Sequence, residues 1–209
     1  MITPTFNLEN AILAQGYTLI AGIDEAGRGP WAGPLCAAAV ILDIKNFDND
    51  AVRDSKMIPA KKRTELSGWL KENCLTWSIG EVSSEEIDSL GLQLANKTAM
   101  KRAITNLTTK PDFILTDYVG RIEFRTPFQV VKSGDKLSFS IAAASIIAKV
   151  YRDALMMELA KVYPEYGFEQ HKGYGTKLHS EMIKKYGLCP IHRTSFAPIK
   201  RVAKSGVTG

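Results

Sequence analysis

Two adjacent carboxylates stand near the start of the stretch GIDEAGRGPWAGP, which runs from Gly22 to Pro34. The apolar residues before them are typical of a strand that enters a core, where Asp24 and Glu25 are costly unless a cation meets them. Two more acids have similar surroundings, because Asp117 ends a short apolar segment and Asp135 lies in a glycine turn. Oxygen ligands gathered at one sheet edge suit magnesium. The four acids therefore predict a divalent-metal site.

Each acid also has a purely structural interpretation. Asp24 or Asp135 could cap a helix, Asp117 could belong to a turn, and Glu25 could be a surface charge. Caps and turns outnumber catalytic acids in any chain, so a single acid would indicate nothing. The combination of four favours a site, and their clustering in space is a hypothesis at this point.

Glycines surround the arginine that follows the first acid pair. The segment Gly27, Arg28 and Gly29 matches neither a phosphate-binding P-loop nor a dinucleotide-binding fingerprint. Glycines at these positions let a ligand approach the backbone amides beside the carboxylates, and the arginine between them can meet a phosphate. The alternative interpretation is turn geometry alone.

Composition and charge bound the class of protein. The chain has 209 residues, 45% of them hydrophobic, which fits one globular domain. It shows no apolar run of membrane-spanning length and no secretion signal, so we expect a cytoplasmic protein. Its three scattered cysteines predict neither disulfides nor a zinc site. The net charge of +5 favours a polyanionic partner, although each basic cluster, such as Lys61 to Arg63, also fits a solvated helix face.

Periodicity and turn signals predict an α/β fold in which strands position the acids. The first two strands should form a hairpin through the glycine and proline turn. Acids that end two strands of a mixed sheet can converge at one edge. Strands are expected at residues 18–24, 37–43, 76–82, 112–117 and 128–131, and helices at 58–72, 84–107 and 140–150, with a helical extension from about residue 164.

Five motifs together resemble the type 2 ribonuclease H family, also called ribonuclease HII. They are GIDEAGRGPWAGP, DSK at Asp54 to Lys56, SGDKLSFSIAAASIIAKVYRD, HKGYGT and HRTSF, and they occur in the family's order between about Ala21 and Ala197. The resemblance implies a ribonuclease H-like mixed sheet flanked by helices, in a single catalytic domain over residues 1–209 with a C-terminal helical extension. It also implies cleavage of RNA in RNA/DNA hybrids and on the 5′ side of single ribonucleotides in duplex DNA.

The resemblance assigns roles residue by residue. The family's metal-binding catalytic acids fall on the four acids chosen above: Asp24, Glu25, Asp117 and Asp135. The family's element that senses the ribose 2′-hydroxyl through its backbone matches Gly27, Arg28 and Gly29, and its sugar-stacking tyrosine matches Tyr174. Two Mg²⁺ or Mn²⁺ ions roughly 4 Å apart would then leave 5′-phosphate and 3′-hydroxyl ends.

Further residues are expected to contact phosphate. Ser145 and Lys149 lie one helical turn apart and could face a backbone phosphate, as could Lys56. Ser145 could equally be a small packing residue, and Tyr174 a half-buried anchor of a loop. The chain departs from the family at Tyr118, where glycine usually follows the third acid, so we expect a different local turn after Asp117. We expect a monomer.

Two other classes are compatible with the acids. One is a different ribonuclease H-like enzyme, such as a DNA nuclease or recombinase, and the other is a binding module that holds metal without turnover. The glycine-arginine-glycine element beside Tyr174 argues against the first, because it has a purpose only if a 2′-hydroxyl is read. The presence of all four acids argues against the second.

Overall fold

The computed structural model describes residues 3–48, 52, 58–117 and 122–205. Its centre is a mixed five-stranded sheet in the order β3-β2-β1-β4-β5, in which β1, β2 and β3 are antiparallel and β4 and β5 run parallel to β1. The strands are β1 (Ile20–Ala26), β2 (Leu35–Leu42), β3 (Cys74–Val82), β4 (Phe113–Asp117) and β5 (Phe128–Val131). The predicted α/β class, the five strands and the first hairpin are confirmed.

The first strand is longer than predicted at its C-terminal end. We expected it to end at Asp24, but β1 continues to Ala26 because β2 pairs with it as far as Glu25 opposite Ala37 and Ala26 opposite Cys36. Asp24 and Glu25 therefore lie within a central strand, where successive side chains point to opposite faces. The side chains of Asp24 and Glu25 therefore leave β1 on opposite faces of the sheet.

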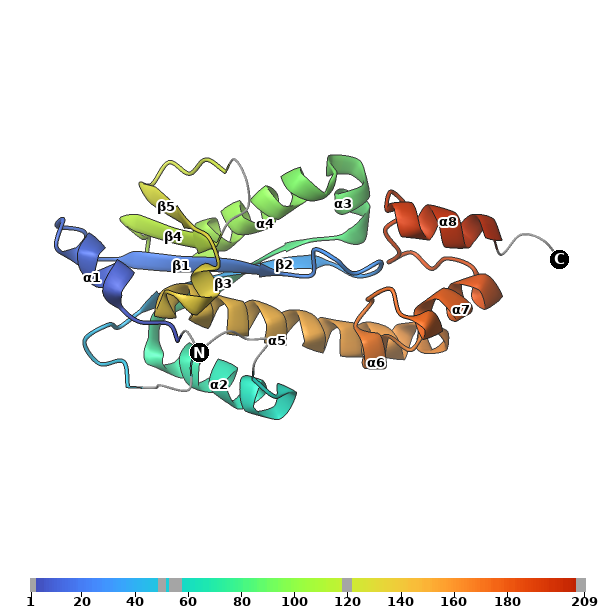
Figure 1. Ribbon diagram of the computed structural model, residues 1–209, viewed down its shortest axis with the longest axis horizontal. Helices are drawn as coiled ribbons and strands as arrows, with labels where there is room; N and C mark the ends of the chain where they lie inside the picture. The colour runs from blue at the N-terminus through green and yellow to red at the C-terminus, as the bar shows by residue number, and fades with distance from the viewer. Residues whose placement is uncertain (1–2, 49–51, 53–57, 118–121, 206–209) are drawn as a thin grey trace.

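Helices cover both faces of the sheet (Figure 1). One face carries α3 (Ser84–Leu90) and α4 (Leu92–Asn106), and the other carries α2 (Ala60–Asn73) and α5 (Phe139–Val162). Helix α5 lies very close to the sheet, since a Cβ added at Gly22 would overlap the main chain of Ser140. The small residues at the start of α5 permit this close packing, which brings α5 side chains near the end of β1.

The single long helix predicted for residues 84–107 is wrong. Gly91 has φ 75°, in the region that favours glycine, and it separates α3 from α4. Helix α3 begins with a capping box, in which the Ser83 hydroxyl accepts from the Glu86 N–H at 3.1 Å and the Glu86 carboxylate accepts from the Ser83 N–H at 3.0 Å. Apolar periodicity runs through both helices, so it could not reveal the break.

The capping box gives a test of local stability. Ser83→Ala should lower the free energy of unfolding by about 1 kcal/mol, because an orphan N–H at the helix start loses its acceptor. Urea unfolding of the variant would measure this loss, with Glu85→Gln in the same exposed turn as the control. An unchanged unfolding midpoint for Ser83→Ala would show that the cap contributes nothing.

A short helix that the sequence did not predict supports the start of α5. In α1 (Asn7–Leu13), the buried Glu9 accepts from the Ser138 hydroxyl at 2.6 Å and the Ser140 N–H at 3.0 Å. A carboxylate at this position satisfies helix N-terminal donors. Helix α5 then runs for 24 residues to Val162, well beyond the predicted end at residue 150.

The C-terminal part of the chain is helical from Pro164 onward and lies beyond one end of the sheet (Figure 1). Its elements are η3 (Pro164–Tyr166), α6 (Phe168–His171), α7 (Lys177–Tyr186) and α8 (Ala197–Ser205). That this part is an extension of one catalytic domain, and not a separate domain, stays a prediction. Within the described ranges, no helix combines the length and apolar content needed to cross a bilayer.

Candidate active site

The parallel pairing of β1 and β4 brings two of the acids together. Ile23 is paired with Thr116, so the residues that follow, Asp24 and Asp117, lie side by side on neighbouring strands. Asp135 comes from the turn η2 (Gly134–Lys136), which precedes α5. These three acids and Glu25 line one cavity of about 650 Å³. The convergence that the sequence could only suggest is present.

Asp24 is buried at the wall of this cavity. It is 8% exposed and accepts the Glu25 backbone N–H at 2.8 Å. Burial raises the pKa of its carboxyl well above the usual range, and the negative charges of Glu25 and Asp117 raise it further. A hydrogen bond from Ser145 acts in the opposite direction. A nearby cation would remove much of this penalty.

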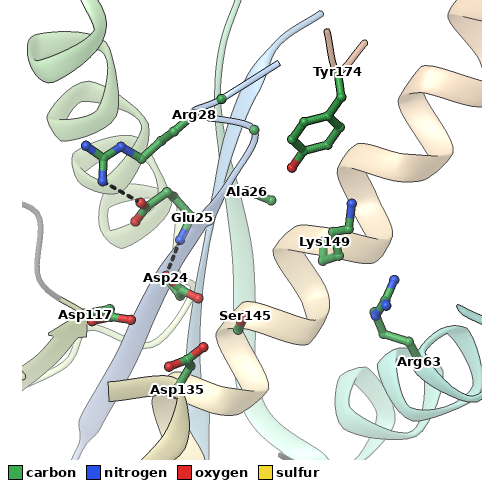
Figure 2. Close-up of a pocket in the computed structure, with 12 residues that line it drawn as sticks. Asp24, Glu25, Ala26, Arg28, Arg63, Asp117, Asp135, Ser145, Lys149 and Tyr174 are labelled. Carbon is green, nitrogen blue, oxygen red and sulfur yellow. Dashed lines mark hydrogen bonds and ion pairs between the residues drawn. The ribbon is translucent and has the colours of Figure 1, made fainter. Parts of the chain in front are cut away.

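Glu25 leans toward Arg28 on the same wall of the cavity (Figure 2). Its Oε1 atom lies 3.4 Å from the Arg28 guanidinium, while Oε2 is buried and forms no hydrogen bond within the described part of the chain. Burial raises the pKa of Glu25, and Arg28 opposes that shift. A buried carboxylate oxygen without a donor is suited to a cation.

These observations test whether the site fits a divalent metal. The donors are four carboxylates around one cavity, one of them with an unbonded buried oxygen, and their mutual repulsion favours a cation. In the part of the chain described, no group of three or more His, Cys, Asp or Glu side chains already has the arrangement to hold an ion. The donor chemistry fits, and the carboxylates would have to turn toward the ions.

The opposite wall of the cavity is cationic and aromatic. Figure 2 shows Lys149 and Arg63 across the cavity from the acids, with Tyr174 above them. Lys149 Nζ lies 2.7 Å from Asp153 Oδ1 and 5.7 Å from the centre of the Tyr174 ring. Arg63 Nη1 lies 3.7 Å from Asp153 Oδ2. One carboxylate therefore orients two cations beside a negatively charged wall.

The interpretation of the cluster from Lys61 to Arg63 as a solvated helix face is wrong for Arg63. It lines the cavity, and its Nη2 donates to the carbonyl of Ile58 at 2.8 Å. The signal was available, since residues 63, 66 and 70 have helical spacing and Leu66 and Leu70 are buried. The position of Arg63 on the buried face of the helix therefore indicates a role that the exposed Lys61 and Lys62 do not share.

The glycine-arginine-glycine turn lies next to Tyr174. A Cβ added at Gly29 would come 3.8 Å from Tyr174 Cε1, and the Trp31 N–H donates to the Gly173 carbonyl at 2.7 Å. Gly27 has φ 98°, so a side chain there would be strained. Backbone groups of the turn and the tyrosine ring thus border the same space.

Comparison with known proteins identifies the chain. A family model described as ribonuclease HII matches residues 21–199. This chain belongs to the ribonuclease HII family. The enzyme is therefore an endoribonuclease of the ribonuclease H type, and its family membership indicates dependence on a divalent metal.

Relatives of this ribonuclease HII family member agree with the assignment. The ribonuclease HII of Acholeplasma laidlawii is 48% identical over 94% of this chain and 96% of its own. The crystal structure of ribonuclease H2 from Pyrococcus horikoshii OT3 aligns with a TM-score of 0.79 at 26% identity, covering 92% of this chain and all of that one. The structure titled Bst-RNase HIII in complex with Mn²⁺ shares the fold, with a TM-score of 0.69 at 17% identity over 92% of this chain and 71% of its own.

The structure brings nearly all of the residues predicted for this ribonuclease HII site together around one cavity. The cavity is lined by Asp24, Glu25, Gly27, Arg28, Gly29, Asp117, Asp135, Ser145, Lys149 and Tyr174. Lys56 and Tyr118 lie outside the described residues. Ser145 also lies against Asp24, so it helps to hold an acid whether or not it meets a phosphate.

Proposed function

We propose that this enzyme cleaves the RNA strand of RNA/DNA hybrids and the 5′ side of single ribonucleotides in duplex DNA. The reaction would be attack of water on the phosphodiester, leaving 5′-phosphate and 3′-hydroxyl ends. One observation carries the proposal: a single cavity places four carboxylates opposite two cations, with Tyr174 and the Gly27–Gly29 turn at its edge. This combination suits a phosphodiester whose neighbouring sugar is recognised.

The four acids would hold two Mg²⁺ or Mn²⁺ ions. Support comes from their donor chemistry and from the related ribonuclease HIII that was solved in complex with Mn²⁺. When bound, such ions activate a water and stabilise the leaving 3′-oxygen. Asp24 would be central, because it lies between Asp117 on the next strand and Ser145 on α5.

The remaining residues would place the substrate. Lys149 and Arg63 would contact backbone phosphates, since they carry positive charge on the wall that faces the acids. The Gly27–Gly29 backbone would hydrogen-bond the 2′-hydroxyl, and Tyr174 would pack on the adjacent sugar. A site built to bond a hydroxyl rejects the deoxy analogue strongly, because its own polar groups are then left unpaired.

The role of Lys149 can be tested by substrate binding. Lys149→Ala should weaken binding of hybrid and of plain DNA duplex alike, and should lower the salt dependence by about one phosphate contact. Binding would be measured in Ca²⁺ over a series of salt concentrations. Lys161→Ala is the matched control, because this lysine of α5 is exposed and paired with Glu158 outside the cavity. A loss confined to ribonucleotide-containing duplex would contradict a simple phosphate contact.

We further infer that the enzyme is a cytoplasmic monomer, with one catalytic domain and a helical extension from about residue 164. Its positive net charge of +5 supports a nucleic-acid partner. Sedimentation of the free enzyme would test the monomer.

The proposed function predicts a defined pattern of cleavage. A labelled duplex with one ribonucleotide and an RNA/DNA hybrid should both be cut with Mg²⁺ and should stay intact with chelator. An otherwise identical all-DNA duplex should stay intact in both conditions. Cutting of the all-DNA duplex would indicate a DNA nuclease, and binding without cutting of any substrate would indicate a binding module.

A further inference from the structure

Two buried arginines lie behind the Gly27–Pro34 turn, and the proposed chemistry uses neither of them. Arg152 comes from α5 and Arg193 from the HRTSF motif, and both are fully buried. In the described part of the chain neither forms a salt bridge with a carboxylate. A buried charge without an ionic partner is costly, so hydrogen bonds must compensate for it.

Arg193 holds both ends of the turn. Its Nη2 donates to the carbonyl of Gly27 at 2.7 Å, and its Nη1 donates to the carbonyl of Arg28 at 3.1 Å. The same guanidinium donates to the carbonyl of Gly33 at 3.0 and 2.8 Å and to that of Pro34 at 3.1 Å. One side chain thus fixes the glycine-arginine-glycine element relative to the point where the turn enters β2.

Arg152 connects the same turn to the loop that carries Tyr174. It donates to the carbonyls of Pro34 at 2.9 Å and Ala32 at 3.1 Å, and to the carbonyl of Lys172 at 3.0 Å. Its guanidinium carbon lies 6.0 Å from the centre of the Tyr174 ring. The turn, the tyrosine loop and α5 are therefore joined through a single guanidinium.

The geometry of these bonds requires arginine. A guanidinium presents five donors in a rigid planar fork, whereas a lysine ammonium offers three donors on a flexible stem. The two arginines satisfy carbonyls of the turn that β pairing leaves without partners. A lysine offers fewer donors, and burial would lower its pKa, so it could not hold the two ends of the turn at a fixed spacing.

We propose that Arg152 and Arg193 are positioning residues that fix the spacing between the Gly27–Gly29 turn and Tyr174, and so set the preference for a ribonucleotide. The inference rests on the proposed function, in which these two elements read the ribonucleotide. A fixed spacing is needed because a ribonucleotide differs from a deoxyribonucleotide by only a single hydroxyl. Misplacement of recognition groups by about 1 Å can cost about 10²-fold in rate.

Arg193→Lys and Arg152→Lys test this role, since both keep a long basic side chain and lose the planar fork of donors. In Ca²⁺, each should lower the binding preference for a duplex with one ribonucleotide over the same all-DNA duplex by about tenfold, which corresponds to the loss of about one hydrogen bond to the hydroxyl. Affinity for all-DNA duplex, and Mn²⁺ binding to the free enzyme, should change by less than about twofold, because the acids and Lys149 are not altered. Leu70→Ala, on the buried face of α2, is the control for general destabilisation and should leave the preference unchanged.

Every outcome decides the proposal. It is overturned if both lysine variants keep the wild-type preference, if Leu70→Ala lowers the preference equally, or if neither lysine variant unfolds cooperatively. In the last case the arginines would serve overall stability alone. The proposed function fails separately, when the wild-type enzyme itself shows no preference for the ribonucleotide.

Discussion

Asp24→Asn is expected to lower turnover by at least about 10³-fold while making the metal-free protein more stable. The loss follows because this carboxylate lies at the centre of the acid cluster, beside Asp117 and Glu25. The gain follows because a neutral amide relieves repulsion and can still accept the Glu25 N–H that Asp24 accepts.

The gain in stability should depend on pH in a defined direction. Burial raises the pKa of Asp24 in the folded state above the value near 4 of an unfolded chain. Above about pH 4 the unfolded chain therefore releases this proton more readily, which destabilises the folded wild type. The stability advantage of Asp24→Asn should be small at about pH 4, should grow as the pH rises through the raised pKa, and should then level off.

Urea unfolding of both proteins from about pH 4 to about pH 8 in chelator would measure this advantage. Asp48→Asn, which alters an exposed acid outside the cavity, is the control. Added Mg²⁺ should stabilise the wild type more than the variant. Near-normal turnover of Asp24→Asn, or lower stability of the metal-free variant at neutral pH, would contradict the metal site.

Tyr174→Ala is expected to lower cleavage at a single embedded ribonucleotide by about 10²-fold, and cleavage of an RNA/DNA hybrid by less. Tyr174 is 43% exposed at the cavity edge, and its ring lies close to Gly29 and Lys149, where it can contact the neighbouring sugar. In a hybrid that sugar has its own hydroxyl and other contacts, so the ring matters less there.

Turnover on both substrates and binding in Ca²⁺ would be measured together. Tyr174→Phe should retain most activity if stacking is the contribution, and Tyr186→Ala removes an exposed tyrosine outside the cavity as a control. Equal losses on the two substrates, or a loss of binding large enough to account for the rate, would contradict the role of Tyr174.

The four acids could be predicted because their signal is local. Three of them end an apolar segment or lie in a glycine turn, and parallel pairing of β1 with β4 then brings Asp24 and Asp117 together. The end of β1 was misplaced because strand length depends on the partner, and β2 pairs with Glu25 and Ala26. No pattern within residues 18–26 contains that information.

Other features depend on contacts between distant parts of the chain. Helix α1 is supported by Glu9, whose partners in the Ser138–Ser140 segment are far along the sequence. Arg193 bonds the carbonyl of Gly27 across a separation of 166 residues. Its motif was visible in the sequence, but its role could not be, because donation to a backbone carbonyl leaves no signature in the residue that accepts.

The central claim is that this cavity hydrolyses the phosphodiester beside a ribonucleotide. Analysis of the product ends from a duplex with one ribonucleotide tests this claim most directly. With Mg²⁺ we expect one cut on the 5′ side of the ribonucleotide, a 3′-hydroxyl that a polymerase can extend and a 5′-phosphate that a ligase can join, with no product from Asp24→Asn. A 2′,3′-cyclic phosphate, or cleavage that persists in chelator, would contradict metal-dependent attack by water at this site.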